Sequence, residues 1–429
     1  MKVSLNWIKD YVPLPDSLTP SQLSYDLTMT TVEVEGYEDL GAALDKIVIG
    51  KVVSLAKHPQ ADRLTLVQTD VGEAEPKEIV CGGDNLREGM LVAVAPPGSK
   101  VRWHGEGDLV ELKETKIRGV KSFGMICASN EIGLAELFPL KSEKEIVDLS
   151  SLHVTPGTPI ADALGLRDII FEIDNKSLTN RPDLWGHYGI ARELAAIYSL
   201  PLSPLPVPPN VDAIKKLGTK ALRAQIQDTD LCTRYIGALI ENVSVCESPN
   251  WLKSRLSSVG QRPIDLIVDL TNYVMFALGQ PTHAFDAKNV SNTSITVRRA
   301  QEKEGLVLLD AKEIALTSNA LVIADDKQSV ALAGIMGGEN SGVSPETTTL
   351  LLESANFEPV QVRHTATRYG LRTEGSMRWE KGIDSPRAEA GADLFFALLH
   401  QLQPSATVVE YLDVYPVQPE SKSVSVSRD

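Results

Sequence analysis

The chain has 429 residues, of which 43% are hydrophobic and 23% charged, so it is expected to be a soluble globular protein too long for one core. Its formal net charge of -15 works against non-specific nucleic-acid binding, which depends on neutralising phosphates, so any RNA contact must be local. No stretch approaches the ~20 apolar residues of a membrane span, and no signal-peptide pattern opens the chain. We therefore expect a cytoplasmic protein.

The four cysteines do not form a recognisable metal or disulfide pattern. They are Cys81, Cys127, Cys232 and Cys246, with no Cys-x-x-Cys pair and no histidine at zinc-ligand spacing. In a soluble chain without an export signal this favours buried free thiols, and it predicts no metal site.

The first 150 residues change pattern near residue 40. Apolar residues at helical spacing in Met1–Val12 and Ser21–Leu27 predict a small helical element over residues 1–39. Residues 40–150 contain short β-rich runs separated by Gly and Pro turns, at Ile47–Val53, Leu64–Val71 and Leu91–Ala95. Closely spaced short strands predict a small barrel.

Residues 151–200 return to α/β character and end in an amphipathic helix, Tyr188–Tyr198. The barrel is therefore expected to be inserted into a discontinuous small α/β domain formed by residues 1–39 and 151–200. Residues 201–209 hold five prolines, which fix φ and remove backbone donors, so they predict an extended connector.

Residues 210–400 read as one α+β domain. Strands are expected at Ile295–Ala300, Leu306–Leu309, Leu321–Ala324 and Leu350–Leu352. A helix is expected to begin with Ser248 as its cap and Pro249 at its first position, and to stop at Gly260. Val424–Asp429 reads as a strand, so residues 401–429 are interpreted as the start of a following, truncated domain.

One basic cluster lies on strand-and-turn sequence within the expected barrel. It consists of Lys113, Lys116, Arg118 and Lys121. Lys116 and Arg118 should share one face of a strand and leave Ile117 facing inward, an arrangement that can follow a phosphate backbone. Because Glu111 and Glu114 interleave with the cations, these side chains could equally well only solvate an edge strand.

The stretch Thr271–Asp286 combines polar side chains with an apolar helix-like run, which suits a pocket. His283 follows Pro281, and an imidazole near its ordinary pKa of ~6.5 can orient or activate water at neutral pH. Thr271 and Asn272 could instead cap a helix, and a histidine beside a proline is often a turn or core residue.

Two further segments could complete such a pocket. Glu353 ends the apolar run Leu350–Leu352, where a carboxylate at a strand end can accept a hydrogen bond or can simply be solvated. Gly334, Gly337 and Gly338 permit a tight turn and close backbone approach, although their spacing is not that of a dinucleotide-binding loop.

These motifs resemble a known family. Thr-Asn-Tyr-Val, Gly-Gln-Pro-x-His-Ala-Phe-Asp and the segment Tyr369–Ser376 resemble the editing domain of the beta chain of bacterial phenylalanine-tRNA ligase. The segments His58–Leu64, Glu78–Asn85 and Lys116–Ala128 resemble the oligonucleotide-binding (OB-fold) barrel of tRNA-binding proteins. The resemblance implies an α+β multidomain protein, with an OB-fold barrel inserted in a small α/β domain that is followed by an α+β editing domain.

The resemblance also implies roles for individual residues. As catalytic residues for hydrolysis of tyrosine from tRNA(Phe) it indicates His283, Glu353, Thr271 and Asn272; as substrate-binding residues, Gly334, Thr373, Gly375 and Pro281; and as tRNA-binding residues, Lys113, Lys116, Arg118 and Lys121. The commoner family pattern has alanine where Gly375 stands, which should widen the pocket slightly.

In this family the alpha subunit activates the amino acid with ATP and Mg²⁺, and the two subunits form an alpha2 beta2 heterotetramer. The resemblance therefore implies an alpha subunit and tRNA(Phe) as partners, no cofactor bound by this fragment and no aminoacylation by it alone. Two rivals remain open: a non-catalytic tRNA-docking and assembly module with a degenerate pocket, and a free-standing editing factor.

A second polar motif, Asn180-Arg181-Pro182-Asp183, also occurs in the family. It could be mistaken for a catalytic cluster. We interpret it as structural, with Arg181 and Asp183 flanking a rigid turn and Asp183 capping the helix that follows.

Overall fold

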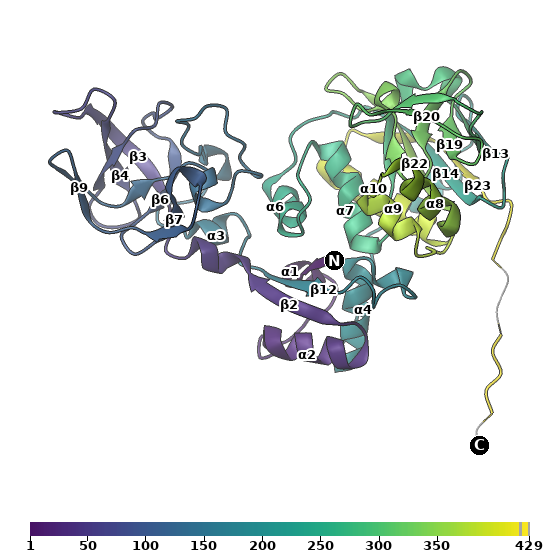
Figure 1. Ribbon diagram of the computed structural model, residues 1–429, viewed down its shortest axis with the longest axis horizontal. Helices are drawn as coiled ribbons and strands as arrows, with labels where there is room; N and C mark the ends of the chain where they lie inside the picture. The colour runs from purple at the N-terminus through teal and green to yellow at the C-terminus, as the bar shows by residue number, and fades with distance from the viewer. Residues whose placement is uncertain (420–422, 428–429) are drawn as a thin grey trace.

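The computed structural model describes residues 1–419 and 423–427. Figure 1 shows a mixed α+β protein, in which a purple and blue β-rich body and a green and yellow body of sheets and helices both adjoin a smaller unit that carries the N-terminus. None of the helices in the described residues is long and apolar enough to cross a membrane.

The smaller unit is built from both ends of the first 200 residues. Its sheet has the order β1-β12-β2, with strands β1 (Lys2–Ser4), β12 (Ile169–Ile173) and β2 (Val34–Asp39). Its helices are α1 (Leu5–Lys9), α2 (Pro20–Thr30) and α4 (His187–Tyr198), whereas α3 (Ile160–Ala163) packs against the β-rich body. The first residues thus form a strand rather than the start of a helix.

Both strand pairs of this sheet are antiparallel, so the α/β character expected for residues 151–200 is wrong. β1 and β2 are joined through α2 and run in the same direction, and β12 lies between them in the opposite direction.

The β-rich body is a five-stranded sheet with the order β11-β6-β3-β4-β5 that nearly closes, because its two end strands approach each other. Its strands are β3 (Val48–Lys57), β4 (Thr65–Asp70), β5 (Lys77–Cys81), β6 (Leu91–Ala95) and β11 (Met125–Ile126). Two hairpins extend from it, β7 (Lys100–Arg102) with β8 (Leu109–Glu111) and β9 (Thr115–Ile117) with β10 (Val120–Ser122). The three strands expected from the sequence are present.

The proline-rich connector lies against the protein rather than free in solvent. The backbone N–H of Ser203 donates to the carbonyl of Tyr11 at 2.7 Å, and Leu202 and Leu205 pack on the core of the smaller unit. After it, α5 (Val211–Ile214) leads into the last region.

The last region contains two larger sheets. One has the order β13-β16-β19-β20-β21, formed by Arg223–Ile226, Ser294–Arg299, Leu321–Ala324, Ser329–Leu332 and Met336–Gly337. The other has the order β15-β22-β14-β23, formed by His283–Asp286, Thr349–Phe357, Cys232–Glu241 and Thr407–Val414. A small hairpin pairs β17 (Gly305–Val307) with β18 (Glu313–Ala315).

Helices cover one face of the second sheet. They include α7 (Leu266–Leu278) and α10 (Arg387–Leu402), while α6 (Asn250–Ser258), α8 (Pro359–Tyr369) and α9 (Glu374–Trp379) complete the region. The other face packs against the first sheet through a separate apolar core.

The start of α6 differs from the sequence expectation. Its N-cap is Pro249, and the Ser248 hydroxyl donates instead to Asp269 on α7 at 2.5 Å. Ser248 therefore ties two helices together rather than capping one.

The C-terminal segment also differs from expectation. β23 pairs with β14, so the sheet continues past residue 400, where the sequence placed a domain boundary. Residues 423–427 form no strand, and Val424 is 86% exposed with no apolar surface to cover it. The rest of the strand expected over Val424–Asp429, residues 428–429, lies outside the described residues.

The four cysteines are free thiols. Cys81, Cys127 and Cys232 are buried as expected, whereas Cys246 is exposed. Cys246 lies in the loop between β14 and α6, where its Sγ accepts a hydrogen bond from the Gln403 side chain at 3.7 Å.

Candidate functional site

A cavity of about 490 Å³ opens between α7, the start of β15 and the turn that joins β20 to β21. It is lined by all eight residues to which the resemblance gave catalytic or substrate-binding roles: Thr271, Asn272, Pro281, His283, Gly334, Glu353, Thr373 and Gly375. This volume lies within the range of small-molecule sites, about 300–1,000 Å³. The cavity is therefore the candidate functional site.

α7 supplies one wall of the cavity. The helix begins at Asp265, whose side chain accepts from the N–H groups of Ile267 and Val268, and it ends at Gly279 in the left-handed conformation, with φ 74°. Pro281 cannot continue the helix, so the chain turns directly into β15. Helix end and strand start thus meet at the cavity.

Thr271 and Asn272 lie inside α7, so the alternative that they cap a helix is wrong. The Thr271 hydroxyl donates its proton to the Val268 carbonyl at 2.7 Å. Its oxygen can therefore only accept a hydrogen bond from a ligand in the cavity. Asn272 is partly exposed at the cavity wall, and its amide can both donate and accept there.

The strand register places His283 and Glu353 directly opposite each other. They pair across the antiparallel strands β15 and β22, so their side chains stand on the same face of the sheet. Seventy residues of chain separate them, but the backbone ladder makes them immediate neighbours.

Glu353 lies in the middle of β22, not at a strand end as the sequence suggested. The strand can continue past Glu353 because the next two polar side chains form hydrogen bonds inside the protein. Ser354 donates to the Ala388 carbonyl at 2.7 Å, and Asn356 donates to the Ile383 carbonyl at 2.6 Å. Glu353 is consequently 8% exposed, not solvated.

Burial shifts both ionisable groups of the site. It lowers the pKa of His283 to about 4 and raises the pKa of Glu353 to about 7, because a low-dielectric surrounding penalises each charged form. The sequence-based expectation of an imidazole near its ordinary pKa is thus wrong. At pH 7 the His283 ring is neutral, and Glu353 can be present both as the protonated carboxyl and as the carboxylate.

Several buried polar atoms around the cavity have no hydrogen-bond partner among the described residues. They include Oγ1 of Thr282, Nε2 of His283 and Oε2 of Glu353. Buried polar atoms are nearly always paired in folded proteins, so such a cluster marks a place where a polar ligand completes the hydrogen bonding.

The glycine turn brings backbone against the imidazole. Gly334 has φ 69°, which favours glycine, and a Cβ at Gly337 would lie 2.6 Å from Cε1 and 2.7 Å from Nε2 of His283. Gly337 therefore leaves the space that the ring occupies, while the edge-to-face contact with Phe285, 4.5 Å between ring centroids, holds the ring from another side.

The wall at the start of α9 contains Thr373 and Gly375. Thr373 caps α9 by accepting from Ser376 N at 3.1 Å, and it donates to the Ile335 carbonyl at 3.0 Å, which ties the helix to the glycine turn. A Cβ at Gly375 would meet its nearest neighbours, in Thr373 and Pro281, at 3.7 to 3.9 Å, an ordinary contact. Alanine would fit there without rearrangement.

The sequence did not single out several cavity-lining residues. Asp310 and Glu374 add two carboxylates, and Met275, Ile335 and Trp379 add apolar surface. Met275 and Glu374 lie inside segments that the sequence analysis singled out, but nothing in those segments marked them as pocket residues, so only their place in the fold identifies them.

The basic residues of the barrel lie on the β9–β10 hairpin and the loop before it. Lys113, Lys116, Arg118 and Lys121 are all exposed. Arg118 does not share a strand face with Lys116, because Arg118 (φ 44°) and Gly119 (φ 87°) form the two-residue turn. Lys116 instead pairs with Lys121 across the hairpin, and Lys121 forms an ion pair with Glu114 at 3.0 Å.

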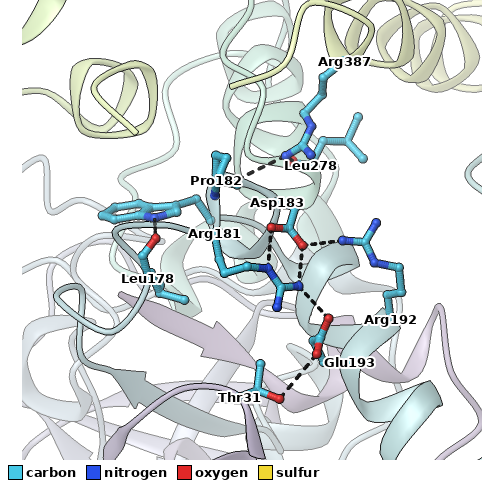
Figure 2. Close-up of polar contacts among 10 residues, drawn as sticks. Thr31, Leu178, Arg181, Pro182, Asp183, Arg192, Glu193, Leu278 and Arg387 are labelled. Carbon is cyan, nitrogen blue, oxygen red and sulfur yellow. Dashed lines mark hydrogen bonds and ion pairs between the residues drawn. The ribbon is translucent and has the colours of Figure 1, made fainter. Parts of the chain in front are cut away.

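Figure 2 shows Arg181, Pro182 and Asp183 of the Asn180–Asp183 motif within a polar junction. Arg181 donates to Asp183 at 2.9 and 2.7 Å and to Glu193 at 2.7 Å. From α10, Arg387 donates to the carbonyls of Pro182 and Leu278 at 3.1 and 3.2 Å.

The motif thus acts structurally in this chain, but not through a helix cap. The N-cap of α4 is Gly186, and no side chain caps it, so the capping role expected for Asp183 is wrong. The motif instead fixes the carboxyl end of α7, the helix that lines the cavity.

No group of three or more His, Cys, Asp or Glu side chains that could hold a metal ion occurs in residues 1–419 and 423–427.

Comparison with known proteins identifies two domains. Residues 47–158 match a putative tRNA binding domain, and residues 231–404 match a B3/4 domain. These ranges contain the barrel and the cavity, respectively.

Curated relatives match nearly the whole chain. It is 38% identical over 418 residues to a phenylalanine–tRNA ligase beta subunit of Syntrophotalea carbinolica, covering 97% of this chain and 50% of that protein. It is 40% identical over 426 residues to that of Latilactobacillus sakei and 41% identical over 418 residues to that of Geobacter metallireducens, covering 51% and 50% of them and 97% of this chain in each case. The chain spans about half the length of these relatives, and along that half it is similar to phenylalanine–tRNA ligase beta subunits.

Proposed function

We propose that this chain binds tRNA(Phe) and hydrolyses the ester of tyrosine wrongly attached to it, as the editing part of a phenylalanine–tRNA ligase. The carrying observation is a cavity in which one buried carboxyl group and one neutral imidazole stand opposite each other on paired strands. The relatives are named as ligase subunits, which supports this setting.

The chemistry requires a second site. The amino-acid pocket of an aminoacylation site, shaped for one side chain, cannot strongly reject an isostere that adds only a hydroxyl. The discrimination between valine and threonine, for example, is about 100-fold. An editing site reverses the problem by recognising that hydroxyl. Glu353 can accept a hydrogen bond from the phenol of tyrosine, whereas phenylalanine offers no donor.

We assign to His283 and Asn272, which both line the cavity, the role of orienting a water molecule at the ester carbonyl. The water oxygen forms a bond to the carbonyl carbon, the bond to the ribose oxygen breaks, and a water proton ends on that oxygen. Tyrosine and free tRNA are the products. Because the pKa of His283 is lowered to about 4, the ring acts as a neutral hydrogen-bond acceptor rather than as a proton donor.

The remaining assignments follow the family. We propose that the barrel is an OB-fold, inserted in a small domain of residues 1–39 and 151–200, and that the editing domain extends to the end of β23. The alpha subunit carries aminoacylation with ATP and Mg²⁺ in an alpha2 beta2 assembly in the cytoplasm. No step of the proposed hydrolysis runs through either cofactor.

The first test compares two esters. The wild-type chain should deacylate tyrosyl-tRNA(Phe) faster than phenylalanyl-tRNA(Phe), and Glu353→Gln should reduce this preference by about tenfold, because a charged acceptor is replaced by a neutral one. Single-turnover release of labelled amino acid measures both rates. Unchanged deacylation in a chain carrying both His283→Ala and Glu353→Ala would contradict the proposal, and tRNA binding without hydrolysis by wild type would favour the docking module.

The second test concerns the basic hairpin. Lys116→Glu should weaken tRNA binding and make the dependence of log affinity on log salt shallower by about 1 for each phosphate that the protein no longer neutralises. Fluorescence titration between 50 and 200 mM salt, on the order of the physiological range, measures both. Lys216→Glu, an equal charge change at an exposed lysine outside the barrel, is the control. Equal effects of the two variants would mean that the hairpin does not contact tRNA.

A further inference from the structure

One buried side chain beside the cavity has no role in the site described so far. Tyr235 on β14 has no exposed surface, and its hydroxyl has no partner of good hydrogen-bond geometry among the described residues. Oε2 of Glu353 is likewise buried and without a hydrogen-bond partner among the described residues. Two unpaired buried atoms that could satisfy each other, one a donor and one an acceptor, are unusual in an apolar core.

The strand register places the two side chains together. Gly237 of β14 lies directly opposite Glu353, and Tyr235 lies two residues before Gly237, so its side chain is on the same face. A Cβ at Gly237 would lie 3.5 Å from Cε1 of Tyr235. The tyrosine ring therefore leans over Gly237, into the space beside the Glu353 carboxyl.

The two groups also influence each other's charge. Burial is the larger cause and raises the pKa of Glu353 to about 7, while the Tyr235 hydroxyl opposes it. Burial, and then the Glu353 carboxyl, raise the pKa of Tyr235 well above its usual range, so its hydroxyl keeps its proton. The other titratable groups around the carboxyl are His283 on β15, the buried Cys232 thiol on β14, and Asp310 and Glu374 on the cavity wall.

We propose that Tyr235 is a positioning residue that donates its hydroxyl proton to Oε2 of Glu353 and so holds Oε1 toward the cavity. A small rotation of either side chain completes this bond. The phenol of a tyrosyl ester then donates to Oε1, while Tyr235 keeps the other oxygen occupied. The substrate in this statement rests on the proposed function, but the contact between Tyr235 and Glu353 does not.

The contact has a predicted pH signature. Loss of a donor to the carboxylate destabilises the charged form, so Tyr235→Phe should raise the pKa of Glu353 by about one or more. Carbon-13 NMR titration of carboxyl-labelled glutamate measures this directly, and disappearance of one signal in Glu353→Gln assigns it. Phenylalanine keeps the ring packing, and thermal unfolding checks that the variant is folded.

Tyr411→Phe is the matched control. Tyr411 is also buried, 7% exposed, on the next strand of the same sheet, but it pairs with Ala238 and so faces the opposite side of the sheet. This variant should leave the pKa of Glu353 unchanged. An unchanged pKa in Tyr235→Phe as well would overturn the proposal.

Deacylation provides a second readout. In Tyr235→Phe the preference for the tyrosyl over the phenylalanyl ester should fall about tenfold, through a higher KM for the tyrosyl ester. Activity on the tyrosyl ester should increase as Glu353 loses its proton, and in the variant this increase should occur at higher pH. If wild type hydrolyses neither ester while the pKa of Glu353 still moves, the proposed function fails and the positioning role stands. If wild type edits and Tyr235→Phe matches it in pKa, KM and pH profile, the positioning role fails alone.

Discussion

Replacement of Gly337 by alanine is expected to reduce deacylation of tyrosyl-tRNA(Phe) by about 100-fold while leaving the protein folded. The added methyl group would lie within 2.7 Å of two atoms of the His283 ring, so the ring must move. The edge-to-face contact with Phe285 limits where it can go. A displacement on the order of 1 Å is enough to remove a water-orienting group from its working position.

Single-turnover kinetics with a thermal-unfolding check would measure this loss. Gly375→Ala is the control, because it adds the same methyl group to the same cavity at ordinary contact distances. Its loss of rate should be much smaller, because no neighbouring atom has to move. Equal rates for Gly337→Ala and wild type would show that the position of His283 does not matter for hydrolysis.

Replacement of Arg378 by alanine is expected to lower the free energy of unfolding by about 3 kcal/mol. Arg378 is fully buried on α9 and joins two parts of the molecule. Its Nε donates to the Trp185 carbonyl at 3.0 Å, its Nη1 donates to Glu374 at 2.6 Å, and its guanidinium stacks 4.6 Å from the centre of the Phe276 ring. Alanine would leave a buried carbonyl unpaired beside an empty space.

Urea denaturation followed by tryptophan fluorescence would report this change, since Trp185 and Trp379 lie near the substitution. Arg372→Ala is the matched control from the turn just before α9. Its side chain is 68% exposed and forms only a 3.4 Å ion pair with Glu380, so its loss should cost about 1 kcal/mol or less. Similar losses of unfolding free energy in both variants would mean that the buried contacts of Arg378 stabilise the protein no more than an exposed ion pair does.

The sequence predicted the members of the cavity better than their arrangement. Polar residues in two motifs pointed to His283 and Glu353, and the glycine spacing pointed to a tight turn. The direct pairing of His283 with Glu353 depends on the order of strands in a sheet, which no local pattern contains. The mid-strand position of Glu353 could not be predicted, because the polar residues Ser354 and Asn356 that follow it suggest the end of a strand. Only their hydrogen bonds to the chain around α10 show that they are buried within the strand.

Other residues escaped prediction for related reasons. Tyr235 stands in an apolar strand and reads as core, and only the register and Gly237 place it beside Glu353. Arg118 was expected on a strand because an Arg-Gly pair is not among the usual signals of a two-residue turn. The pKa values of His283 and Glu353 depend on burial, which sequence spacing does not give.

The late strand β23 has a practical consequence for expression of the editing region alone. The B3/4 match ends at residue 404, but Thr407–Val414 covers the outer edge of β14, and the Glu410 carboxylate accepts from the N–H groups of Lys220, Ala221 and Leu222. A fragment cut at residue 404 would leave a long apolar strand with open backbone groups, which invites pairing between copies and aggregation. A recombinant fragment intended to remain monomeric should extend through Val414.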